Sequence, residues 1–149
     1  MTVTKFKMKN YTTEVTPERS IAEIEKMLAL FGATAIMKEF TPDGRVFDLA
    51  FKIQDKAFKL PAHVDGVKKV LFEGSRPPTS KDIERRREDR ANRVAWRIIK
   101  DWIHAQLSLI ASGQAHPHEV FLPYMFDGKK TLYQTYTDGL LLGPKVKNE

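Results

Sequence analysis

The sequence predicts an α+β fold in which a small antiparallel sheet precedes one long helix. Two observations carry this prediction. Apolar side chains occupy every second position from Phe47 to Ile53, which is typical of a strand with one buried face. A helical pattern runs without interruption from residue 81 to residue 113, and an aromatic segment follows it. We therefore expect a strand, a helix and a three-stranded meander, then the long helix and a closing C-terminal segment.

Length and composition are those of an ordinary globular protein. The 149 residues are 42% hydrophobic and 30% charged, and a chain of this length can bury the core of one domain. We expect a single domain, 1–149, made of a sheet with a helix (1–64), a connection (74–80), the long helix (81–113) and a closing segment (114–149). No cysteine is present, which excludes disulfides and thiolate metal sites.

Charge and hydropathy limit the classes of partner that this chain is expected to have. The net charge of +6 and the pI of about 9.5 favour nucleic acid or an acidic protein. Residues 81–104 hold eight Lys or Arg against five Asp or Glu, which is half of the excess. No apolar run suits a signal peptide or a membrane span. We therefore expect a cytoplasmic protein with no membrane partner.

The first expected element is a strand at 4–9, where apolar and basic residues alternate. Phe6 and Met8 would face the core, and three lysines would face solvent: Lys5, Lys7 and Lys9. This basic face could extend a nucleic-acid contact. Lysines on an exposed strand also protect a sheet edge from aggregation, which needs no ligand.

A helix is expected next, because Thr16-Pro17 and then Ser20 with Glu23 are helix-start signals. A hydroxyl, with a carboxylate three residues later, satisfies the free N–H groups of a first helical turn. Four apolar side chains then recur on one stripe before Gly32 ends the helix: Ile21, Ile24, Leu28 and Phe31.

The meander follows as three short segments. Residues 33–40 have strand composition, and 41–44 form a turn in which Pro42 presets φ and Gly44 tolerates a positive φ. The alternating strand comes next, and a third strand at 56–60 completes the sheet. A helix packed on the apolar face of such a sheet gives the α+β class.

A short helix at 65–73 and a connection containing Pro77-Pro78 lead to the long helix, which Thr79 or Ser80 would cap. At about 1.5 Å per residue this helix would be close to 50 Å long. Its first apolar strip is the expected core stripe: Ala91, Val94, Ala95, Ile98, Trp102, Ala105 and Leu109. A second apolar strip lies roughly opposite: Trp96, Ile99, Ile103, Leu107 and Ile110. Covering it requires the C-terminal aromatic segment or a second copy of the chain, in which case a symmetric homodimer is the usual form.

The third strip of the helix is cationic. Its members follow at spacings of four, three, four, three and four: Arg86, Arg90, Arg93, Arg97, Lys100 and His104. One interpretation is that the row follows a phosphate backbone, for which arginine offers a bidentate donor. The other is that three i,i+4 pairs neutralise it: Asp82 with Arg86, Asp89 with Arg93, and Arg97 with Asp101. The excess of cations over acids favours the first.

Catalytic signals are weak. The sequence contains no phosphate-binding loop and no nucleophile elbow, so we expect no enzyme, no cofactor and no small-molecule substrate. Asp43, Asp48 and Lys52 partly resemble the site of a metal-dependent nuclease, but Asp48 and Lys52 are four residues apart instead of two. His116-Pro-His118-Glu119 offers two imidazoles and a carboxylate without further ligands. A loop or a helix cap is the favoured interpretation there.

Three stretches resemble a group of short phage, prophage and bacterial proteins that have no established activity. These are SIAEIEKMLALFGATAI (20–36), ERRREDRANRVAWRIIKDWIHAQLSLIASGQA (84–115) and EVFLPYMF (119–126). The resemblance spans most of the chain in order. It implies a mobile-element setting and assigns no role to any residue.

These observations give two functional hypotheses. The first is a sequence-nonspecific nucleic-acid-binding accessory protein, with DNA favoured over RNA and single-stranded DNA as one candidate ligand, in phage or mobile-element DNA metabolism. Five helix residues would contact phosphate, with Lys5, Lys7 and Lys9 extending the track: Arg86, Arg90, Arg93, Arg97 and Lys100. The second is a protein-interaction module, with a regulatory or anti-defence role against a host or phage protein. It would dock through Trp96, Ile103, Tyr124 and Phe126.

Overall fold

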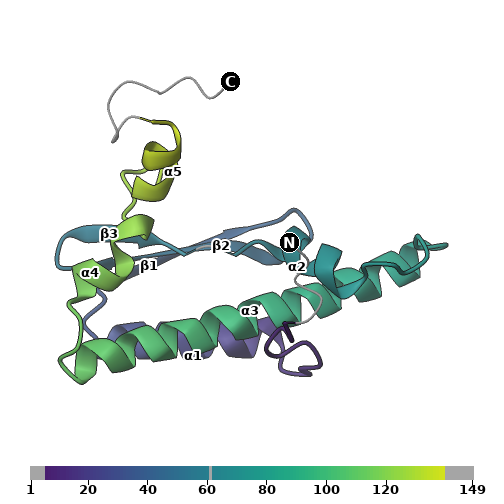
Figure 1. Cartoon of the computed structure of the whole chain (residues 1–149), viewed down its shortest axis with the longest axis horizontal. Helices are drawn as coiled ribbons and strands as arrows, with labels where there is room; N and C mark the ends of the chain where they lie inside the picture. Colours follow the sequence, from purple (N-terminus) through teal and green to yellow (C-terminus); the bar gives the residue numbers. More distant parts are fainter. Residues whose placement is uncertain (1–5, 61, 140–149) are drawn as a thin grey trace. The chain divides into compact units, whose positions relative to one another are not determined.

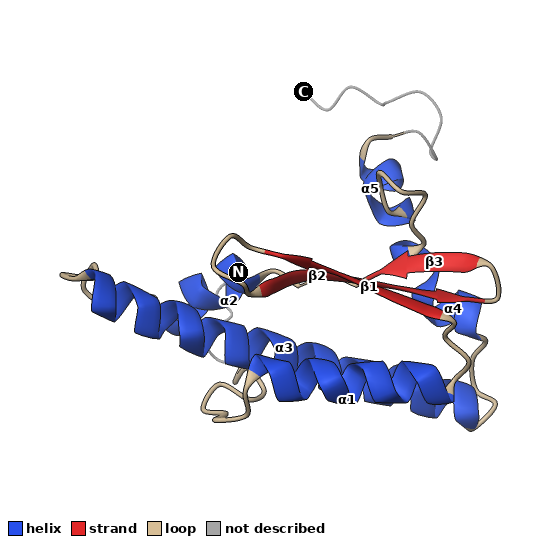
Figure 2. Cartoon of the chain, turned by 180° about the vertical axis from the view of Figure 1, so that it is seen from behind, coloured by secondary structure: helices blue, strands red, loops and turns tan. Residues whose placement is uncertain are grey.

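The protein is described from a computed structural model, which covers residues 6–60 and 62–139. The expected α+β class is confirmed, with a helix, a three-stranded antiparallel sheet and a long helix in that order. The helices and strands are drawn in Figures 1 and 2. The chain divides into two compact units. Unit 1 contains residues 6–27 and 62–105, and unit 2 contains residues 28–60 and 106–139. Each unit is thus assembled from two separate stretches of chain.

Unit 1 is helical. Helix α1 (Pro17–Leu30) begins after Thr16, whose hydroxyl oxygen accepts the backbone N–H of Arg19 at 3.2 Å. The predicted start at Thr16-Pro17 is therefore confirmed. Ser20 lies inside the helix and is fully buried. The last turn of α1 belongs to unit 2.

Helix α2 (Val64–Leu71) and helix α3 (Lys81–Ala111) complete unit 1, although the last turns of α3 belong to unit 2. Ser80 caps α3, because its hydroxyl oxygen accepts the N–H of Ile83 at 3.2 Å. The helix ends just before Gly113, whose φ of +76° is a conformation that favours glycine. Its 31 residues correspond to roughly 46 Å. Within unit 1, α1 and α3 lie side by side (Figure 2).

The sheet of unit 2 has the order β1-β2-β3, with β1 (Ala35–Phe40), β2 (Val46–Ile53) and β3 (Lys56–Lys59). Its strands match the predicted meander, and Gly44 in the first turn has the expected positive φ, +88°. The alternation along β2 places Leu49, Phe51 and Ile53 in the core, whereas Phe47 at the strand's start is 39% exposed. The pattern therefore predicted the buried face correctly over most of the strand.

The C-terminal part of unit 2 holds α4 (Pro117–Phe121), a 3-10 turn (Leu122–Tyr124) and α5 (Leu132–Thr137). Phe121 is fully buried and meets Phe51 edge to face, with ring centroids 5.3 Å apart, and lies 5.8 Å from Phe58. The backbone N–H of Phe126 donates to the carbonyl of Ala57 at 2.8 Å. The predicted closing segment therefore packs on the end of the meander within unit 2.

The predicted N-terminal strand is wrong for its described part. Residues 6–9 form a bend followed by a turn, and Asn10 has a φ of +65°. Phe6, which the alternation placed in the core, is 79% exposed. Long-range contacts replace strand pairing here: the Asn10 side-chain amide donates to Asp101 on α3 at 2.7 Å. Because the alternation covers only a few residues, it could not distinguish this turn from a strand.

Candidate nucleic-acid interface

The cations of the predicted strip have different surroundings in unit 1. Arg86 is open, with 76% of its side chain exposed, and it forms the predicted pair with Asp82 at 3.1 Å. Arg97 and Lys100 each expose only 19% of their side chains. His104, the last member of the strip, is exposed. The strip is therefore open at the start of α3 and covered at Arg97 and Lys100.

Glu23 on α1 accounts for the covered part. Its carboxylate accepts a hydrogen bond from Arg97 at 2.7 Å and lies 3.6 Å from the Lys100 ammonium group. Burial opposes the charge and would raise the pKa of Glu23. The hydrogen bond from Arg97 and the charges of Arg97, Lys100 and Arg19 outweigh it and hold this pKa below its ordinary value. Arg97 and Lys100 therefore join α1 to α3.

The predicted pair between Arg97 and Asp101 is wrong, because Arg97 turns toward Glu23. Asp101 instead binds the N-terminal segment, through Asn10 and through Lys9 at 3.4 Å. Burial would raise the pKa of Asp101, but these contacts and the nearby charge of Lys100 keep it below the ordinary value.

The N-terminal segment also occupies part of two arginines at the middle of the strip. Arg90 Nη2 donates to the carbonyl of Tyr11 at 3.0 Å, and Arg93 Nε donates to the carbonyl of Thr13 at 3.3 Å. Carbonyl oxygens accept these hydrogen bonds without cancelling the positive charge. Arg90 and Arg93 therefore hold residues 11–13 beside α3.

An open depression of about 450 Å³ lies next to this segment in unit 1. Its lining combines an aromatic ring, an isoleucine, one acid and four arginines: Phe72, Ile83, Asp89, Arg86, Arg87, Arg90 and Arg93. The guanidinium carbon of Arg87 lies 5.0 Å from the centroid of the Phe72 ring, and that of Arg90 lies 5.7 Å from it. Cation–π contacts of this kind orient guanidinium groups without neutralising them.

Two of the acids of α3 pair with a lysine of α2. Glu84 and Glu88 both pair with Lys68 on α2, the latter at 3.0 Å. The hydrogen bonds to Glu84 and then to Glu88 raise the pKa of Lys68 above its ordinary value. These pairs hold α2 beside α3, and they direct two of the carboxylates to a lysine instead of an arginine.

Phe72 and Arg87 belong to this site but were not predicted. Arg87 lies three residues before Arg90 and hence on the same side of the helix, so the spacing rule could have found it. Phe72 directly follows α2, and the chain then turns through residues 74–80, so that α3 runs beside Phe72. No periodic signal in the sequence predicts that return.

The three N-terminal lysines do not form a common face in the described residues. Lys5 lies outside the described residues. The Lys7 ammonium group lies 5.3 Å from the centroid of the Tyr11 ring, and Lys9 pairs with Asp101. Lys7 remains exposed, and Lys9 is partly neutralised by its partner.

The predicted docking surface is not exposed at its centre. Trp96 and Ile103 have 0% exposure, so their expected exposed parts are absent. Tyr124 and Phe126 are half-buried, and Phe126 contacts the Lys59 ammonium group at 5.2 Å within unit 2. The buried residues of α3 come from both apolar strips, because Ala91, Val94 and Ala95 are buried together with Trp96 and Ile103. The homodimer was predicted to cover the second strip, and Trp96 and Ile103 do not need such a cover.

The residues considered for catalysis have structural contacts. Asp48 pairs with Lys59 at 3.0 Å, and Asp43 binds Thr41 and Arg45. The His116 ring accepts the N–H of His118 at 3.2 Å and caps α4, which confirms the interpretation as a helix cap. Among residues 6–60 and 62–139, no group of three or more His, Cys, Asp or Glu side chains could hold a metal ion.

Two further findings complete this description. No helix in the described part of the chain is long and apolar enough to span a membrane. Comparisons with family models, curated proteins and solved structures gave no match to the chain.

Proposed function

We propose that the protein binds nucleic acid without sequence preference, through the arginines that surround Phe72 in unit 1. The observation that supports this proposal is the depression in which Arg86, Arg87, Arg90 and Arg93 gather with one acid among them. Phosphate oxygens are the natural partners of converging guanidinium groups. Such contacts read neither base nor sequence.

The contact surface is shorter than the sequence predicted. Arg97 and Lys100 bind Glu23 and leave the track, so it runs from Arg86 to Arg93. The seven helical steps from Arg86 to Arg93 correspond to about 10 Å, which is the length of roughly three base pairs along the axis of a duplex at about 3.4 Å each, and hence about three phosphates of one strand. We propose DNA as the ligand, with single-stranded DNA as the form whose phosphates can best converge on a compact site.

Salt dependence tests this proposal. Binding of labelled single-stranded and double-stranded DNA of one sequence is measured by fluorescence polarisation between about 50 and 200 mM salt. The logarithm of the binding constant should fall against the logarithm of salt with a slope of roughly −2 to −3, because about three phosphates are neutralised. A row of five helix cations would give a slope of about −3.5 for single strands or −4.5 for a duplex.

Arg86 gives the cleanest variant, because Arg90 and Arg93 also hold the N-terminal segment and Arg87 donates to the carbonyl of Arg76 at 2.8 Å. Arg86→Ala and Arg87→Ala should each weaken binding and reduce the magnitude of the slope by about 1. Lys26→Ala is the matched control, since Lys26 is an exposed cation on α1 of the same unit. Absence of binding at low salt would refute the proposal, and so would unchanged binding by the Arg86→Ala, Arg87→Ala double variant.

A further inference from the structure

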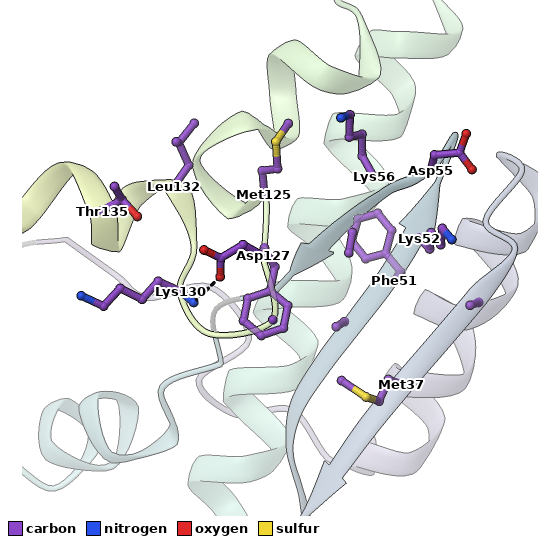
Figure 3. A pocket seen from close by; sticks show the side chains of 15 residues that line it. Met37, Phe51, Lys52, Asp55, Lys56, Met125, Asp127, Lys130, Leu132 and Thr135 are labelled. Carbon is purple, nitrogen blue, oxygen red and sulfur yellow. Dashed lines mark hydrogen bonds between the residues drawn. The ribbon is translucent and has the colours of Figure 1, made fainter. Parts of the chain in front are cut away.

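A groove of about 670 Å³ lies on the sheet of unit 2 (Figure 3). Ala35 and Met37 of β1, Ala50 and Lys52 of β2, and Ala57 of β3 form its floor. Residues from 125 to 135 form its other wall, including Met125, Leu132 and Thr135. The volume lies within the range of known ligand sites.

Strand register explains why this face is hollow. Lys52 pairs with Ala35 on one side and Ala57 on the other, and Ala50 pairs with Met37. Cross-strand partners point to the same face, so three alanines lie together beneath the groove. The larger side chains Phe51 and Phe58 are cross-strand partners at the alternate positions, and of the two only Phe51 contributes to the lining of the groove. Short side chains thus leave room above this face of the sheet.

Two lysines of the groove are available to a ligand. Lys52 and Lys56 are exposed and form no ion pair with any described residue. Asp127, on the wall, accepts the backbone N–H groups of Lys130 and Lys129, which lower its pKa. Lys130 pairs with Asp138 in turn. Asp55 is the other acid in the lining. The two lysines without ion pairs, Lys52 and Lys56, therefore outnumber the one carboxylate that backbone amides do not bind.

The edge of the sheet beside the groove is open. In the described part of unit 2, β1 has β2 as its one neighbouring strand. The N–H of Leu60 donates to the carbonyl of Leu49, so the backbone groups of Leu49 and every second residue after it point to β3. Those of Ala50 and Lys52 therefore point to β1, and their partners there are Met37 and Ala35.

The intervening residue Ile36 consequently directs its backbone groups away from β2, toward the open edge. Met37 and Phe40 on this strand are 53% and 57% exposed. Exposed apolar side chains on an open edge strand form a surface on which another strand can pair.

We infer that unit 2 binds an extended acidic peptide from a partner protein, which pairs with the open edge of β1. Every second side chain of the peptide would lie over the groove, where apolar ones contact Met37 and carboxylates reach Lys52 and Lys56. This site is separate from the arginines of unit 1.

The test uses the full chain and a labelled peptide of about eight residues, in which Glu and Val alternate along one side and Ser fills the other. We expect binding that weakens at least about tenfold in the double variant Lys52→Glu, Lys56→Glu. Lys26→Glu, the same charge change on α1, should bind as the unchanged protein does. The corresponding peptide with Lys in place of Glu should not bind.

Main-chain pairing has its own readout. Methylation of alternate peptide amides should abolish binding, and the amide of Ile36 should gain protection from hydrogen exchange when the unmodified peptide is bound. No binding of the acidic peptide would overturn the inference, as would full binding by the lysine double variant or by the methylated peptide. A sedimenting dimer that the peptide cannot displace would show that β1 pairs with a second copy instead. None of these outcomes depends on nucleic-acid binding.

Discussion

Glu23 shows how a single side chain decides the extent of a charged surface. The sequence presents the cations of α3 as one regular row, and the carboxylate that pairs with Arg97 and Lys100 is more than 70 positions away. The pairing depends on α1 and α3 lying side by side in unit 1. A regular spacing along one helix therefore predicted the positions of the cations but not which of them would face solvent.

Replacing Glu23 by Gln should lower the free energy of unfolding at neutral pH by about 1 kcal/mol, because the pair is partly exposed. The pKa of Glu23 in the folded protein lies below its ordinary value of 4.5, so the charged form is favoured by folding. This contribution is present above pH 4.5 and disappears as the pH falls through the lower folded pKa. Urea unfolding of both proteins across this range should show their difference shrinking toward zero in acid.

Glu14→Gln serves as the control, since Glu14 is exposed and has no contact with the cations of α3. Its stability should match that of the unchanged protein at neutral pH. If the difference caused by Glu23→Gln persisted undiminished at low pH, the ion pairs would not be its source.

At the scale of elements, long or strongly periodic patterns were predicted well. The three strands of the meander, the start of α1 and the whole of α3 follow from alternation, capping residues and glycine positions. Over residues 6–9, the described part of the strand expected at 4–9, the prediction failed because Lys9 and Asn10 bind Asp101, a contact that local pattern cannot reveal. For the same reason, only one of the two parts of the candidate site could be predicted from the sequence. The arginines lie on one helix, whereas Phe72 reaches them through a turn.

The aromatic cluster of unit 2 should dominate the stability of its sheet. Phe121 is fully buried against Phe51 and Phe58, so Phe121→Ala leaves a cavity as well as losing buried area. We expect a loss of about 3–5 kcal/mol in the free energy of unfolding. The neighbouring Leu122 is 45% exposed, and Leu122→Ala should cost less than about 1 kcal/mol. Chemical denaturation of the two variants gives the comparison, and equal losses would contradict the assigned packing.

At the scale of the whole molecule, the single predicted domain and the two compact units make different claims about cooperativity. Hydrogen exchange in the native state distinguishes them. If the units open separately, Phe121→Ala should speed exchange of the β2 amides, near Phe51, and leave the amides of α3 near Arg93 unchanged. Equal acceleration in both places would show that the chain unfolds as one domain.

The interleaved chain of unit 2 has a consequence during translation. Phe58 emerges from the ribosome 63 residues before Phe121, the ring that covers it. At about 5–20 residues per second, the nascent sheet waits roughly 3–13 s with that aromatic face unshielded. Newly made chains should therefore pass through an aggregation-prone state in which this aromatic surface is exposed. Chaperones that bind apolar surface would act in that interval.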